Sequence, residues 1–551
     1  MLLSISVPDK KVSAWTAETT VSDTYRWLGQ LSAADSLESA RDIYQALYTL
    51  NRMEIAPKLR MDLMEIYRAP VSQTAGQLHN RLSHASFPLS HQRFRLAESI
   101  RDLNVEMAYG YKLTLSDLES IKMPVWGKSS MRAQAIFRSI HYLGNVILRS
   151  MYNYLAYPKG TWKELHELYR YAESVKCLED SVIEFRGEAK RTSTIEKRYK
   201  EILLLGLSDP YQMPQGQCGQ VNNFVYRWAD LATISTPSGN PLLKRGGYRI
   251  SLDQDSPGSC VDLDRSPLPE SGNSIRVMDI HPLLDNVTSM IRRIETGTPA
   301  SELDIGSECL EQACLDMLER LGNSWSGKKK RQSARLRMSG MASVCSGINA
   351  IHYFLTKSQG FDAKKFGAGA MSSPVLLSDK GAAGGPIAET DCTSFGVASW
   401  EVVDASAGGA LIRGRENSGI SVKIGDLITL MDPGAKSKFK LFAVRWMKEK
   451  GSEGLEVGLE LMSSSIASIL VGEERGAGGF VPGLMLDKVT SGSKMLPRTL
   501  VLKKNVRGKQ KDIELIEQSD TRSKWVRVLE VVDKTNSYER VSFASLVSDF
   551  K

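Results

Sequence analysis

The spacing of apolar residues changes once along this chain, and that change limits the folds open to it. From Ser22 to Leu321 apolar residues recur three and four positions apart, as in Ile136, Ile140 and Leu143, which predicts amphipathic α-helices. After Leu336 they occur in short runs separated by polar and glycine-rich turns, which predicts β-strands. Helical and strand segments that occupy separate parts of a chain are typical of an α+β multidomain protein.

The length of 551 residues exceeds what one hydrophobic core supports, so we expect several domains. We predict an N-terminal all-α helical domain over 1–322, a β-domain over 323–470 and a second small β-domain over 471–551. A strand or loop insertion is expected at 239–273. In the β-domain, 336–355 is expected to form one long first strand, followed by an inserted loop at 360–399. A stack of helices without a catalytic constellation favours contact with a partner protein.

Two short segments contain the residues that are expected to bind a ligand. Lys330, Arg331 and Arg335 place guanidinium groups four residues apart, and a guanidinium pairs bidentately with phosphate and stacks on aromatic faces. The segment 404–409 combines a carboxylate, a hydroxyl and two glycines in one tight turn. Its Asp404 and Ser406 can read the donor edge of a base, while Gly408 and Gly409 let the backbone come close to a ligand. Together the segments predict a site for an anionic, planar ligand.

The pattern R-x-x-x-R at 331–335, followed by D-x-S-x-x-G at 404–409, resembles the PilZ domain, a bacterial β-barrel that binds cyclic di-GMP. The strand-like segments after Gly409 are similar to the PilZ order, including Val444-Arg445-Trp446 and Val457-Gly458-Leu459-Glu460-Leu461. The resemblance implies that 323–470 is a PilZ-type antiparallel β-barrel. One departure is that the two halves of the motif lie farther apart than the family usually allows.

The resemblance also implies the roles of the site residues. Arg331 and Arg335 pair with the ligand phosphates and lie against guanine faces. Asp404 and Ser406 bind the guanine edge, and Gly409 keeps the turn free of a clashing Cβ. Lys330 and Gly408 are additional expected contacts. The expected ligand is cyclic di-GMP, with no cofactor.

Composition narrows the class of protein further. The formal charge is only +8, no apolar run is long enough to span a bilayer, and the start of the chain has no basic segment ahead of an apolar core. The seven cysteines are scattered without a C-x-x-C pair, and the seven histidines form no metal-ligand motif. We therefore expect a cytoplasmic protein with reduced thiols and no metal site. The sequence contains no P-loop and no G-x-S-x-G motif, so no enzyme activity is expected.

The prediction is a cyclic di-GMP effector that couples ligand binding to a protein partner. One alternative is a scaffold or assembly factor with a PilZ-like barrel that binds no nucleotide, and it predicts the same partners with or without ligand. The other is a nucleic-acid-binding regulator that uses the basic run 328–337. It predicts affinity for any polyanion that falls steeply with salt, but a mild basic excess does not make nucleic acid the expected partner.

Overall fold

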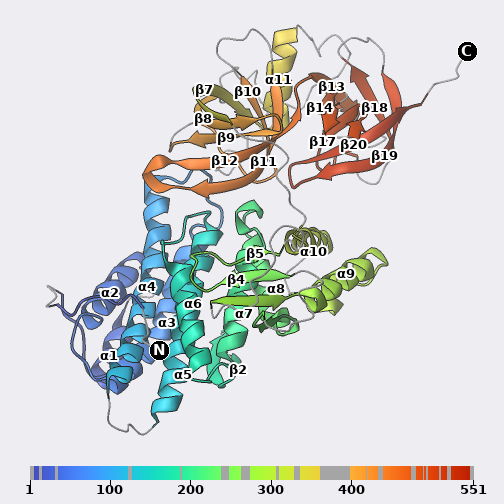
Figure 1. Ribbon diagram of the computed structural model, residues 1–551. Helices are drawn as coiled ribbons and strands as arrows, with labels where there is room; N and C mark the ends of the chain where they lie inside the picture. Colours follow the sequence, from blue (N-terminus) through green and yellow to red (C-terminus); the bar gives the residue numbers. More distant parts are fainter. Residues whose placement is uncertain are drawn as a thin grey trace, which may run out of the picture. The chain divides into compact units, whose positions relative to one another are not determined.

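The computed structural model describes residues 5–11, 15–31, 35–121, 127–186, 189–237, 247–261, 274–305, 310–327, 336–359, 397–416, 419–431, 439–472, 480–487, 489–491, 494–507, 511–517 and 523–546. The chain divides into two compact units. The helical unit comprises 1–85 and 91–330, and the barrel unit comprises 86–90 and 331–551. The predicted order, helices first and β-domains after, is confirmed (Figure 1).

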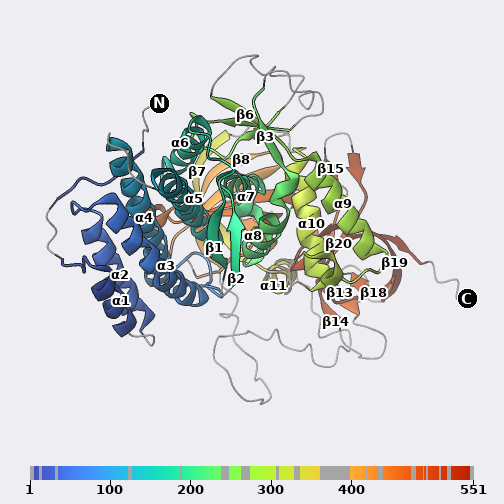
Figure 2. The same ribbon diagram turned by 90° about the horizontal axis from the view of Figure 1, so that it is seen from below.

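The helical unit is built on three long helices that lie side by side (Figures 1 and 2). These are α3 (Pro57–Asn80), α4 (His91–Ser120) and α5 (Lys128–Tyr152). Five shorter helices pack against them: α1 (Val21–Gln30), α2 (Ser36–Leu50), α6 (Thr161–Ser174), α7 (Ile195–Leu207) and α8 (Gln217–Trp228). Two more, α9 (His281–Glu295) and α10 (Glu311–Trp325), pack against each other.

Local chemistry explains where several of these helices begin. Thr20, Asp35 and Thr194 precede α1, α2 and α7, and each side chain accepts a hydrogen bond from a first-turn backbone N–H. Pro57 starts α3, where its missing N–H costs nothing. The apolar stripes then face one another, and residues such as Leu47, Leu63, Ile100, Leu103, Ile136 and Ile140 are fully buried or nearly so.

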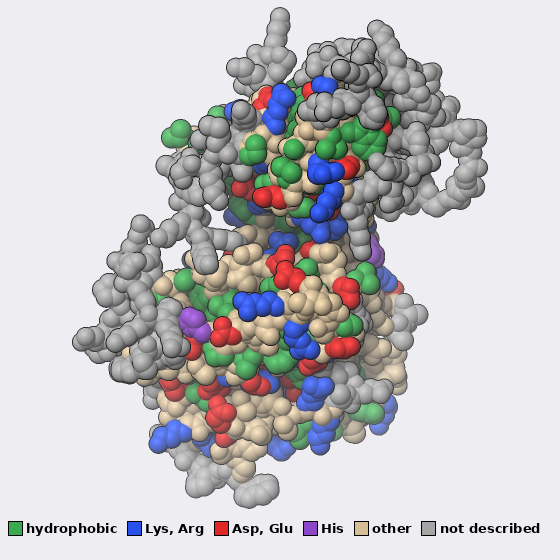
Figure 3. Space-filling model, turned by 90° about the vertical axis from the view of Figure 1, so that its right-hand side faces the viewer, with side chains coloured by type: hydrophobic (Ala, Val, Ile, Leu, Met, Phe, Trp, Pro, Cys, Tyr) green, Lys and Arg blue, Asp and Glu red, His purple; other side chains and the backbone are tan. Residues whose placement is uncertain are grey.

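The helical unit also contains strands. A hairpin pairs β1 (Val182–Arg186) with β2 (Ala189–Ser193). A four-stranded sheet has the order β3 (Thr233–Ser235), β6 (Ile275–Asp279), β4 (Tyr248–Ser251), β5 (Ser259–Cys260). Of the strands in this sheet, β4 and β5 lie within the insertion expected at 239–273, and their partners β3 and β6 lie outside that range. On the face drawn in Figure 3, the helical unit interleaves side chains of both charge signs.

The barrel unit holds two closed antiparallel barrels. The first has the order β10-β11-β12-β9-β8-β7 and the second β13-β14-β17-β20-β19-β18. Their strands are β7 (Leu336–Ser346), β8 (Ala398–Ser406), β9 (Gly409–Gly414), β10 (Leu427–Met431), β11 (Lys440–Glu449), β12 (Leu455–Ser463), β13 (Ile466–Gly472), β14 (Phe480–Leu486), β17 (Thr499–Lys503), β18 (Asp512–Glu517), β19 (Lys524–Lys534) and β20 (Tyr538–Ser545). The short hairpin β15 (Val489–Ser491) and β16 (Lys494–Leu496) lies between β14 and β17 in the chain.

One prediction for the first barrel was wrong. The segment 336–355 was expected to form one long strand, but β7 ends at Ser346 and helix α11 (Ile348–Gln359) follows. Gly347, with φ of +88°, makes the reversal that a residue with a side chain resists. The spacing of Ile348, Ile351 and Leu355 places them on one helical face, which is buried against both barrels. The inserted segment after β7 thus begins with a helix, and residues 398–399 belong to β8; residues 360–396 lie outside the described residues.

The two barrels follow each other closely. The first β-domain was expected to extend to residue 470, yet β13 of the second barrel already starts at Ile466. Residues of α11 and of both barrels form one buried apolar cluster, which includes Leu427 and Leu441 from the first barrel and Leu484 and Val501 from the second. The barrels therefore share a core.

The segment 86–90, which connects α3 to α4, belongs to the barrel unit. Phe87 is buried, and its carbonyl accepts a hydrogen bond of 3.0 Å from the Val422 backbone N–H. The Leu89 N–H donates to Oε2 of Glu449 at 3.5 Å. The spacing of residues in the sequence did not indicate that residues 86–90 would pack in the barrel unit.

Candidate functional site

The hairpin between β8 and β9 gathers the second half of the predicted site. Ser406 pairs with Gly409 across a two-residue turn, and the Ser406 hydroxyl donates to the Gly409 carbonyl at 3.3 Å. Asp404 and Ser406 are two residues apart on β8, so their side chains leave the same face of the strand. Both are partly buried. The hairpin can therefore present a carboxylate and a hydroxyl side by side.

Gly409 is required where it lies. A Cβ built on it would stand 2.1 Å from the Leu459 carbonyl oxygen of β12, far inside any real contact. The Leu461 N–H also donates to the Gly408 carbonyl at 2.9 Å, which fixes the turn against β12. The neighbouring strand by itself therefore excludes a Cβ at residue 409.

The strand β7 enters the barrel beside this hairpin. Leu336, the residue after Arg335 in the sequence, pairs with Ala405, and Arg337 pairs with Asp404. A β-bulge interrupts β7 between Arg337 and Gly340, and a second interrupts the β8–β9 pairing beside Asp404. Bulges re-aim side chains and are common next to binding sites.

The structure places some of the predicted site residues and not others. Asp404, Ser406, Gly408 and Gly409 are brought together at one hairpin. Lys330, Arg331 and Arg335 lie outside the described residues. An exposed residue that the site prediction omitted is Arg337, which lies opposite Asp404. The basic run, which extends to residue 337, was the available sign of it.

Two further arginines of the first barrel are engaged within the protein. Arg413 of β9 pairs with Glu456 at 2.9 Å, and this hydrogen bond raises the pKa of the guanidinium. Arg445, from the segment that resembled PilZ, pairs with Asp533 of the second barrel at 2.8 Å. Arg445 therefore joins the two barrels, a role that strand order alone could not indicate.

The barrels are fastened by neighbouring bonds as well. The Thr535 hydroxyl donates to the Gly425 carbonyl at 3.0 Å, and Ser537 donates to Asp426 at 2.6 Å.

Among the described residues no group of acidic, histidine or cysteine side chains could hold a metal ion. Within the same residues, no helix has the length and apolarity needed to cross a membrane.

Comparisons with known proteins give matches to both units. Residues 22–238 match the family model described as the N-terminal domain of the cyclic-di-GMP receptor FimW, and residues 250–374 match the model of its middle PilZ domain. The second match contains residues 331–335, β7 and α11, and it ends before β8. The chain is also 23% identical over 489 residues to the cyclic-di-GMP receptor FimW of Pseudomonas aeruginosa, an alignment that covers 81% of this chain and 77% of the relative.

Proposed function

We propose that this chain, which belongs to the FimW family of PilZ-domain cyclic-di-GMP receptors, binds cyclic di-GMP at the β8–β9 hairpin of its first barrel. Its N-terminal and middle parts match the two FimW family models. The relative with which it aligns over most of its length is named for the same ligand.

The proposed location of the cyclic di-GMP site rests on the pairing of Leu336 with Ala405. It brings the first residue after the R-x-x-x-R motif next to the strand that holds Asp404 and Ser406. The long intervening segment therefore does not keep β7, which begins directly after the motif in the sequence, from pairing with the strand that holds Asp404 and Ser406.

Each residue has a proposed part in binding. Arg331 and Arg335 supply permanent positive charge and planar donor forks that suit phosphate oxygens and guanine faces. Asp404 accepts hydrogen bonds from the N–H groups of a guanine edge, and Ser406 adds a hydroxyl beside it. Gly409 keeps the hairpin seated on β12, and Lys330, Gly408 and Arg337 are additional contacts.

Calorimetric titration of the full chain with cyclic di-GMP tests the proposal, with GTP and cyclic di-AMP as competing ligands. We expect saturable binding of cyclic di-GMP and its loss in Arg331→Ala or Arg335→Ala. The matched control is Lys440→Ala, which removes an exposed positive charge from β11 of the same barrel. If the wild type takes up no cyclic di-GMP, or if Lys440→Ala weakens binding as much as the motif variants, the proposal is wrong.

We further infer that the chain acts as a cytoplasmic effector without catalysis of its own, and that the helical unit contacts a protein partner. The many helices of the helical unit support a role in protein contacts. Capture of partners by the tagged wild type and by Arg331→Ala, each with and without cyclic di-GMP, measures the coupling. We expect a ligand-dependent partner for the wild type alone; identical capture in all four conditions would favour a scaffold.

A further inference from the structure

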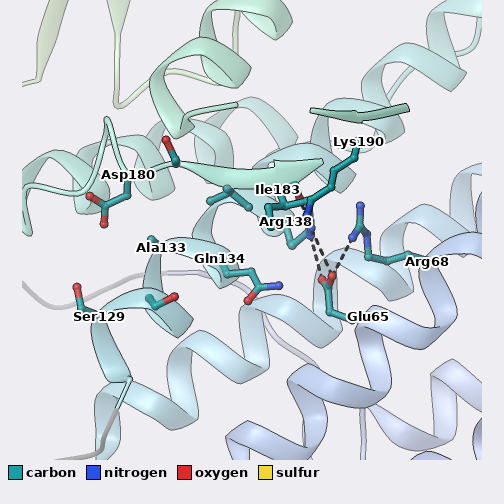
Figure 4. A pocket seen from close by; sticks show the side chains of 12 residues that line it. Glu65, Arg68, Ser129, Ala133, Gln134, Arg138, Asp180, Ile183 and Lys190 are labelled. Carbon is teal, nitrogen blue, oxygen red and sulfur yellow. Dashed lines mark hydrogen bonds and ion pairs between the residues drawn. The ribbon is translucent and has the colours of Figure 1, made fainter. Parts of the chain in front are cut away.

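The helical unit contains an open cavity of about 690 Å³ between α3, α5 and the β1–β2 hairpin (Figure 4). Its volume lies within the range of small-molecule sites, about 300–1,000 Å³. The charged residues that line it are Glu65, Arg68, Arg138, Asp180 and Lys190. All of them belong to the helical unit, so the cavity is separate from the site proposed for cyclic di-GMP.

Positive charge exceeds negative charge at one end of this cavity. Arg68 and Arg138 both point to the single carboxylate of Glu65, at 2.8 and 2.9 Å (Figure 4). The Tyr111 hydroxyl also donates to Glu65, at 2.7 Å. Among the residues that line this end, Glu65 is the one carboxylate for two guanidinium groups, and the exposed Lys190 on β2 adds a third positive charge. The buried Glu184 of β1 also interacts with Arg138, so two carboxylates face three cations.

The guanidinium of Arg138 has donor capacity left over. Its Nε and Nη2 bind Glu65, and Nη2 also donates to the Ile183 carbonyl at 2.7 Å. Its Nη1 has no hydrogen-bond partner among the described residues, and only 2% of the side chain is exposed. A buried charged donor without an acceptor is unfavourable. An anionic oxygen bound at this end would reduce the excess charge.

The opposite end of the cavity offers hydrogen-bond donors to electron-rich oxygens, and it also holds the carboxylate of Asp180. Ser129 and Ser130 lie in the first turn of α5, which has no side-chain cap and no acidic residue in that turn. Unsatisfied N–H groups and the positive end of the helix dipole attract negative charge or electron-rich oxygens. The side chain of Asp180 lies toward this end, away from the three cations (Figure 4).

The lining indicates what kind of molecule carries the anion. Gln134 lies between the ends (Figure 4), and its amide suits hydroxyl groups of a ligand, as does the hydroxyl of Ser181 in the lining. None of the described lining residues is aromatic, so the cavity offers no ring on which a nucleobase could stack. The Ile183 carbonyl of β1 is taken by Arg138, which disfavours the addition of a peptide strand at this edge.

We propose that this cavity binds a small, hydroxyl-rich phosphorylated molecule, with its phosphoryl group at the end formed by Arg68, Arg138 and Lys190. The site is a second ligand site of the protein and is independent of the proposed function. Through this site the helical unit binds a ligand other than the one proposed for the barrel.

Calorimetry on the full chain tests this, with cyclic di-GMP present at saturation so that the barrel site is occupied. The probes are glucose 6-phosphate, inorganic phosphate and uncharged glucose. We expect glucose 6-phosphate to bind, phosphate to compete with it and glucose to give no heat. Lys190→Ala and Arg68→Gln should each weaken binding at least tenfold. Arg41→Ala is the matched control, because it removes an exposed charge from α2 of the same unit and should leave affinity unchanged.

The melting temperature of each variant separates lost binding from lost folding, and Lys190→Ala should melt with the wild type because its side chain is exposed. The proposal is overturned if neither phosphate probe binds, or if Lys190→Ala and Arg41→Ala behave alike. It is equally overturned if only an acidic peptide such as oligoglutamate binds, since the site would then serve a protein partner. Loss of cyclic di-GMP binding alone, with glucose 6-phosphate still bound, would reject the proposed function and leave this site standing.

Discussion

Replacement of Gly409 by alanine tests the geometry of the proposed cyclic di-GMP site most directly. The new Cβ would lie 2.1 Å from the Leu459 carbonyl oxygen, so the strands must separate by at least about 0.9 Å to reach the 3.0 Å limit of real contacts. That movement strains the β9–β12 pairing and the Leu461 N–H···O=C Gly408 bond. Two backbone hydrogen bonds weakened at about 0.5–1.5 kcal/mol each give a loss of about 1–3 kcal/mol.

The assay is thermal unfolding of the full chain followed by calorimetric titration with cyclic di-GMP. A loss of this size lowers the melting temperature of the barrel unit by about 2–12 °C. Binding should weaken at least tenfold, because the hairpin that carries Asp404 and Ser406 moves with Gly409. Gly340→Ala is the matched control, since a Cβ at this glycine of β7 meets nothing within 4 Å. Equal stability and equal affinity of the two variants would refute the placement of the hairpin against β12.

Two further predictions concern the barrel unit, and they follow from its buried groups. Burial raises the pKa of Glu449 to about 7 from an ordinary value of 4.5. Between these values the folded protein keeps a proton that the unfolded chain releases, so stability falls as pH rises through that window. Denaturant titrations at several pH values should therefore show that the free energy of unfolding of Glu449→Gln rises by up to about 3 kcal/mol relative to that of the wild type between pH 4.5 and 7. A pH-independent difference would contradict the burial of this carboxyl. Ile351→Ala removes a side chain of α11 that is 1% exposed between the two barrels and should cost about 2–5 kcal/mol. The neighbouring substitution Asn349→Ala should change the free energy of unfolding by no more than about 0.5 kcal/mol. Equal losses in the two variants would show that α11 does not pack through the face that contains Ile351.

Local patterns explain most of what could be predicted for the helical unit. Helix caps such as Asp35 and Thr194 and apolar residues at helical spacing act over a few positions, so the sequence shows them directly. The break after β7 was missed because a short apolar run such as Ile348 to Leu355 suits a strand or a helix equally. The shared core of the two barrels decided that choice by burying one helical face.

The same contrast applies to the candidate site. The turn 404–409 could be predicted because a carboxylate, a hydroxyl and two glycines within six positions form a local feature. The reason that Gly409 must be glycine lies in Leu459 of another strand, and the partner of Arg445 lies in another barrel.

By itself, the sequence determined the class of most segments and the residue types of the proposed ligand site, since both depend on neighbours along the chain. Only the tertiary structure decided three further points. It pairs β7 with β8 across the long inserted segment, attaches residues 86–90 to the barrel unit, and gathers Arg68, Arg138 and Lys190 at one cavity. Each of these depends on contacts between residues that are far apart in the sequence. Such contacts form only when strands pair and buried surfaces match, so local sequence patterns do not reveal them.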